Sequence, residues 1–219
     1  MTGGGRRRGI LLAGALAVLV AVPLPAQEPG SRCCTRFDYL LEKTIFKVDA
    51  VRLELAFTDG TPARVAGLLA RDAYSSALRD SIAAAFLAAG GATVRFTFER
   101  SFGLERFLRA NRDVMKRLVE AGILSEEEFQ RLDADNVERF QVLASEGVRD
   151  GDRLEHEIDG ERVATRYVDV EGEVRIEEVR VGDAERRALL GSLFGPKSDF
   201  RGGLLDLVLR RAALEGPSP

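Results

Sequence analysis

The 219-residue sequence predicts an α+β domain, in which an antiparallel sheet is covered by helices. Three observations support this fold class. Segments with alternating apolar and polar residues recur along the chain, and segments with apolar residues at three- and four-residue spacing lie among them. Short Gly-containing turns join the last alternating segments, and such turns connect antiparallel neighbours.

The first 26 residues have the pattern of a cleavable signal peptide. Residues 6–8 are basic, 10–22 form an uninterrupted small and apolar run, and 23–27 contain a helix breaker and a cleavage point. The apolar run has 13 residues, fewer than the roughly 20 of a membrane-spanning helix. We therefore expect a mature protein that begins near Gln27, is periplasmic or secreted, and has no stable membrane anchor.

A polar segment without periodicity follows over residues 27–42, and we interpret it as a linker or N-terminal arm. The folded domain is expected over 43–214. Its first strand is predicted over 43–57, where apolar and polar residues alternate until an Asp-Gly pair. A helix is predicted over 72–89, because its apolar residues have helical spacing and Gly90-Gly91 follows them.

The middle of the chain predicts one strand and a helical hairpin. Residues 92–99 alternate as a strand, and residues 103–121 carry an apolar stripe of helical period. Ser125 followed by Glu128 is a capping-box pattern that begins the second helix of the hairpin.

The last third predicts three strands over 153–158, 161–168 and 174–181, with an Asp-Gly turn between the first two. Two helices are predicted to close the domain, over 183–193 and 198–211.

Composition excludes several classes of function. Residues 1–26 hold three of the 32 basic residues and none of the 35 acidic ones, so the mature chain has a net charge of about −6. No basic stripe suggests nucleic-acid binding. The single histidine, His156, is expected to face solvent from a strand, and Cys33 and Cys34 are adjacent, so no metal-ligand set is recognisable. We expect no metal, cofactor or nucleic-acid partner.

Three segments carry a resemblance to a known family. In the first segment, residues 43–55, an aromatic-Lys-Val stretch leads into an apolar run. The second segment, residues 102–124, ends in an Ala-Gly-Ile stretch. The third segment, residues 188–198, contains an apolar helix that is broken at a Gly-Pro pair. In this order they resemble the first core strand, the helix after the central strand and the closing helices of the chalcone isomerase family, in particular its bacterial exported branch. The resemblance implies an open-faced β-sandwich with helices over one face of the sheet and an apolar cleft between them.

The resemblance also implies candidate ligand-binding residues. The family's enzymes place a strand threonine, a helix tyrosine and an asparagine in the cleft, and these positions fall on Asp49, Arg106 and Asp113, with Phe107 and Asn111 nearby. A carboxylate at Asp49 would repel a bound phenolate, so we assign no catalytic residue. The resemblance then favours a non-catalytic protein that binds a small apolar or amphipathic ligand, such as a fatty acid.

Two alternatives stay open. The protein could be an isomerase or intramolecular lyase on an unknown substrate, with Asp49 or Asp113 as acid or base. It could also be a structural protein whose own side chains fill the cleft. An apolar pocket with convergent polar groups favours the two ligand-using functions, whereas a closed cleft favours the structural one. Arg106 and Asp113 also fit an ordinary solvated helix face.

Overall fold

The computed structural model of the protein describes residues 35–41 and 51–215. The predicted signal peptide, the Cys33-Cys34 pair and Asp49 lie outside the described residues, and what was inferred about them stays a prediction.

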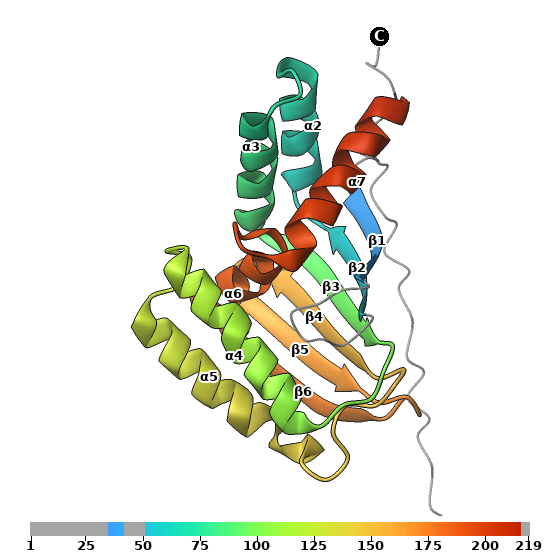
Figure 1. Cartoon of the computed structure of the whole chain (residues 1–219), viewed down its shortest axis with the longest axis vertical. Coiled ribbons are helices and arrows are strands. Elements are labelled where there is room, and N and C mark those ends of the chain that lie inside the picture. The colour runs from blue at the N-terminus through green and yellow to red at the C-terminus, as the bar shows by residue number, and fades with distance from the viewer. Residues whose placement is uncertain (1–34, 42–50, 216–219) are drawn as a thin grey trace, which may run out of the picture.

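One six-stranded antiparallel sheet runs through the molecule, with its strands in sequence order (Figure 1). Each strand pairs with the next one along the chain. Short turns with a glycine at positive φ, Gly160 and Gly172, join the last three strands as the sequence predicts. The strands are β1 (Arg36–Leu41), β2 (Val51–Phe57), β3 (Gly91–Phe98), β4 (Arg153–Asp159), β5 (Arg162–Val168) and β6 (Val174–Val181).

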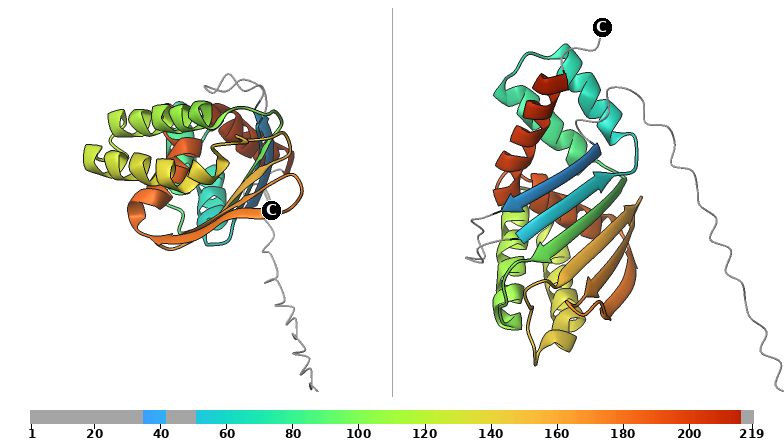
Figure 2. Two further views of the ribbon diagram at one scale, coloured as in Figure 1. Left: turned by 90° about the horizontal axis from the view of Figure 1, so that it is seen from below. Right: turned by 90° about the vertical axis from the view of Figure 1, so that its right-hand side faces the viewer.

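The helices lie on one face of this sheet and leave the other face open (Figure 2). Helices α4 and α5 form the predicted hairpin, and the capping box of Ser125 and Glu128 begins α5 as predicted. None of the helices in the described residues is long and apolar enough to cross a membrane. The described helices are α2 (Thr61–Arg71), α3 (Ser76–Leu87), α4 (Leu104–Glu120), α5 (Glu126–Phe140), α6 (Asp183–Phe194) and α7 (Asp199–Glu215).

Alternation in the strands and helical period in the helices bring their apolar faces together. Phe57 of β2 stacks on Phe86 of α3 at 4.8 Å between ring centroids, and Phe86 stacks on Phe194 of α6 at 4.6 Å. Leu78 and Ile82, two of the apolar residues at helical spacing in α3, are also in this core. The core therefore joins the sheet to two helices, α3 and α6, that lie far apart in the chain.

The open face of the sheet carries charge instead. Arg95 on β3 contacts Glu54 on β2 at 3.2 Å and Glu155 on β4 at 2.9 Å, and Glu54 also contacts Arg36 on β1 at 3.9 Å. These cross-strand pairs are solvated, so each adds little to stability. They keep the open face polar.

Two elements correct the sequence interpretation. Residues 36–41, assigned to the arm over 27–42, form β1, because Phe37 packs its ring edge-on against Phe86 while the strand pairs with β2. Helix α2 is a second correction, because the sequence predicts no element between the strand that ends at residue 57 and the helix that begins at residue 72. Proline is tolerated in the first turn of a helix, where its missing N–H has no partner to lose. Of the strand predicted over 43–57, residues 51–57 form β2.

Candidate functional site

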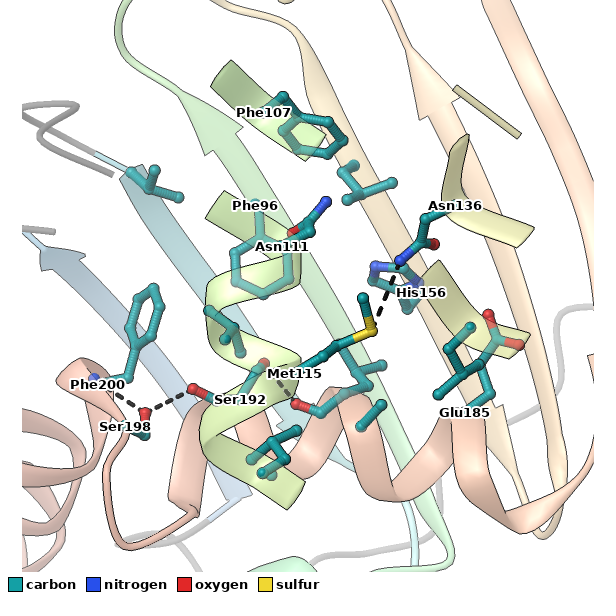
Figure 3. Close-up of a pocket in the computed structure, with 18 of the residues that line it drawn as sticks. Phe96, Phe107, Asn111, Met115, Asn136, His156, Glu185, Ser192, Ser198 and Phe200 are labelled. Carbon is teal, nitrogen blue, oxygen red and sulfur yellow. Dashed lines mark hydrogen bonds between the residues drawn. The ribbon is translucent and has the colours of Figure 1, made fainter. Parts of the chain in front are cut away.

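A cavity of about 170 Å³ lies between the sheet and the helices (Figure 3). Its walls come mainly from β3, β4, α4, α5 and α6. Apolar side chains make up most of them: Leu41, Val51, Phe96, Phe98, Phe107, Val114, Met115, Leu118, Leu132, Phe140, Leu154, Val163, Ala188, Leu189 and Phe200.

Helical and strand periods explain why these side chains meet. Phe107, Asn111, Met115 and Leu118 follow one another on α4 at spacings of four, four and three residues, which places them on one stripe. On α6, a Cβ added to Gly191 would lie 3.0 Å from Leu118. The glycine therefore lets α6 approach α4 closely at this wall of the cavity.

His156 points into the cavity from β4 (Figure 3). Its Nδ1 lies 2.9 Å from the hydroxyl oxygen of the buried Thr165 on β5. Burial, and secondarily the positive charge of Arg139, lower the pKa of His156 to about 3. The imidazole is therefore neutral at physiological pH, with one ring nitrogen a donor and the other an acceptor.

This orientation corrects the expectation that His156 faces solvent. In β4 the histidine lies two residues from both Leu154 and Ile158, and both of these are buried. Residues two apart on a strand share a face, so His156 must share theirs.

Arg139 of α5 lies beside the histidine end of the cavity, with its side chain only 5% exposed. It pairs with Glu185 of α6 at 2.6 Å and also with Glu178 of β6. Its guanidinium donates a further hydrogen bond to the Oδ1 atom of Asn136 at 3.2 Å. Two carboxylates thus flank one buried guanidinium, and the cluster of these three groups carries no net positive charge.

Other charged residues line the cavity near the α6–α7 connection. Arg117 of α4 lies 3.6 Å from Asp199 of α7, and Lys197 lies 2.5 Å from Glu120 of α4. The Lys197 side chain is 53% exposed. Solvent therefore reaches this end, which we call the mouth of the cavity.

The residues predicted to bind ligand are placed differently. Arg106 and Asp113 are exposed on α4, seven residues apart, and neither lines the cavity. Successive helical residues are rotated by about 100°, so a helix that turns Phe107 inward turns Arg106 away. Asp49 lies outside the described residues. The structure does not bring the three together, and their role in binding stays a prediction.

The sequence analysis placed Asn111 only near a candidate position and assigned neither Asn136 nor His156 to the site, yet all three polar residues line the cavity. A signal was present for two of them. Asn111 interrupts the apolar stripe of α4, and His156 interrupts the apolar alternation of β4. A polar residue on a buried stripe is the pattern that indicates a polar contact inside a core or a cavity.

The antiparallel sheet, the helices on one face and the cavity between them define a chalcone isomerase-like fold, which confirms the predicted fold class. A solved structure with this fold is the crystal structure of a fatty-acid binding protein from Arabidopsis thaliana. It matches with a TM-score of 0.52, covers 83% of this chain and 94% of that chain, and shares 15% sequence identity. At this identity the likeness shows the fold alone. No protein-family model and no curated protein matches the sequence.

Proposed function

We propose that this protein binds a small apolar or amphipathic ligand, such as a fatty acid, in the cavity between sheet and helices, without catalysis. The apolar wall of the cavity is the observation that carries this proposal. The fatty-acid binding function of the structural neighbour agrees with it. A cavity with convergent polar groups also favours a ligand-using function over a purely structural one.

The cavity volume limits the part of a ligand that it can enclose. The 170 Å³ exceed the roughly 150 Å³ of an apolar cavity that admits benzene and fall below the roughly 300 Å³ of the smaller drug-sized pockets. A hydrocarbon segment of about six to eight carbons is therefore the expected occupant. A polar head group would remain at the mouth.

Lys197 and Arg117 are the cations that line the mouth within the described part of the chain. Their partners Glu120 and Asp199 are themselves at least one-third exposed, and ion pairs between solvated groups are weak. A ligand carboxylate can therefore replace these partners at little cost. We assign the head group to this end.

Binding is favoured over isomerase or lyase chemistry by the groups that line the cavity. Efficient general acid–base catalysis needs a pKa near the working pH. The pKa of His156 is about 3, and the lining carboxylates Glu185 and Asp199 are held in ion pairs. His156 is thus not poised to exchange a proton at neutral pH.

Calorimetric titration of saturated fatty acids from six to twelve carbons tests the proposal. Each methylene that enters the cavity should tighten binding about fourfold, from roughly 0.8 kcal/mol per buried methylene, until the cavity is full. Ala188→Phe, which adds a ring at the cavity wall, should abolish binding while leaving the unfolding transition cooperative. If ligand-stripped protein binds none of these acids, the proposal fails.

Two single variants locate the head group. Lys197→Ala should weaken every fatty acid by a similar factor, because the carboxylate loses its partner at the mouth. Arg106→Ala, on an exposed position of α4, is the matched control. Weakening by Arg106→Ala alone would instead support the site implied by the family resemblance.

We also propose that the protein is exported, on the basis of the basic, apolar and cleavage segments of residues 6–27. N-terminal sequencing of the protein from its native cells should find a start near Gln27. Retention of residues 10–22 in the mature protein would contradict cleavage.

A further inference from the structure

We propose that the preferred ligand carries a neutral oxygen, as a hydroxyl or carbonyl group, on the part of its chain that reaches Asn111, Asn136 and His156. This inference rests on the proposed binding function and specifies its ligand class. The expected ligand is thus a hydroxy or oxo fatty acid rather than a plain saturated one.

The first step concerns hydrogen-bonding capacity that the protein itself does not use. None of the side-chain hydrogen bonds within the described residues involves Asn111, which lines the cavity. The Asn136 amide nitrogen has only a contact of 4.0 Å with the sulfur of Met115. His156 uses one ring nitrogen toward Thr165. These three side chains can therefore donate hydrogen bonds to a ligand carbonyl or hydroxyl oxygen, and accept a hydrogen bond from a ligand hydroxyl group.

The position of these three side chains in the cavity means that their unused hydrogen-bonding groups affect ligand binding. Asn111 comes from α4, Asn136 from α5 and His156 from β4, and all three point into the cavity (Figure 3). A ligand that is hydrocarbon throughout would cover these groups and exclude water from them. Polar groups that lose water without gaining a partner weaken binding. A ligand oxygen at this depth removes that penalty.

The second step concerns charge. Arg139, beside this end, is already matched by Glu178 and Glu185, and Glu185 itself lines the cavity. Arg180 in turn lies 3.2 Å from Glu178 and also contacts Asp135. Three carboxylates and two guanidinium groups meet in this cluster, so an ionised ligand carboxylate would add to an excess of negative charge. A neutral oxygen is the group that fits.

The third step concerns length. Figure 3 shows Ser192, Ser198 and Phe200 toward one end of the cavity and Asn136 and His156 toward the other. Apolar side chains, including Phe96 and Met115, lie between the two ends. A chain with a carboxylate at the mouth and an oxygen near its other end matches this order of polar, apolar and polar surfaces.

Calorimetric titration at pH 7.5 with octanoate, 8-hydroxyoctanoate and 7-oxooctanoate tests the inference. The two oxygenated acids should bind about threefold to tenfold more tightly than octanoate, the range expected for one net hydrogen bond. Asn111→Leu and Asn136→Leu have similar side-chain size without hydrogen-bonding groups, and they should erase this preference. Gln130→Leu, on an exposed position of α5, is the matched control and should keep it.

A second measurement needs no variant. The sequence has a single histidine, so NMR of its ring nitrogens reports on His156 alone. The hydroxy acid should shift a ring-nitrogen signal as a new hydrogen bond forms, and octanoate should shift it much less.

The outcomes separate this inference from the proposed function. If octanoate binds as tightly as both oxygenated acids, or if the preference survives in both asparagine variants, the inference is wrong and the binding function stands. If none of the three acids binds, both fail together.

Discussion

Acidification is expected to destabilise the protein through its only histidine. Burial and the charge of Arg139 hold the pKa of His156 at about 3 in the folded state, against 6.5 for an unperturbed histidine. The unfolded chain therefore takes up this proton first as the pH falls. The contribution of neutral His156 to stability is complete above pH 6.5 and is lost progressively as the pH falls from there toward 3.

The magnitude follows from the size of the shift. Within this window the free energy of unfolding should fall by about 1.4 kcal/mol per pH unit. Acidification from pH 7.5 to 5.0 should thus remove about 2 kcal/mol, a substantial part of the roughly 5 to 15 kcal/mol of a typical domain. The carboxyl groups of Asp59 and Asp183 have pKa values below their usual range, so their contributions disappear at lower pH than this.

Urea unfolding at pH 7.5 and 5.0 measures the effect. His156→Asn keeps a neutral hydrogen-bonding side chain that does not titrate, so most of the loss on acidification should be absent in this variant. An NMR titration of the single imidazole should show no protonation of the folded protein down to pH 5. A folded-state midpoint near 6.5, or an equal loss of stability in His156→Asn, would refute the argument.

Two further predictions concern stability. Tyr167→Phe should lower the free energy of unfolding in urea by about 1 to 3 kcal/mol, because the buried hydroxyl donates a hydrogen bond to the carboxylate of Asp152 at 2.5 Å. The control Tyr74→Phe, at a residue that is 70% exposed, should lower it far less. Equal losses in the two variants would contradict a special role for the buried hydrogen bond. Replacement of Cys33 and Cys34 by serine should change the melting temperature by only a few degrees. A loss of roughly 2 to 5 kcal/mol in the free energy of unfolding, as on removal of a native disulfide, would instead show that the cysteine pair ties the N-terminal arm to the domain.

Much of the fold could be predicted because its signals are local. The capping box at Ser125, the helical stripe of α4 and the hairpin turn at Gly160 each depend on residues within a few positions of one another. Strand β1 was missed for the opposite reason. In its sequence Leu40, which is 40% exposed, interrupts the alternation of Phe37, Tyr39 and Leu41, and the strand is stabilised by its pairing with β2.

The candidate site also has one part that local sequence patterns determine and one part that depends on tertiary contacts. The sequence by itself determined that Asn111 interrupts an apolar helical stripe and that His156 shares a strand face with Leu154, so both inward positions were readable from period alone. Only the tertiary structure decided that these residues line one cavity with Asn136, and that two carboxylates from β6 and α6 neutralise Arg139 beside it. These contacts join segments far apart in the chain, and their energies depend on burial and distance, which no local pattern encodes.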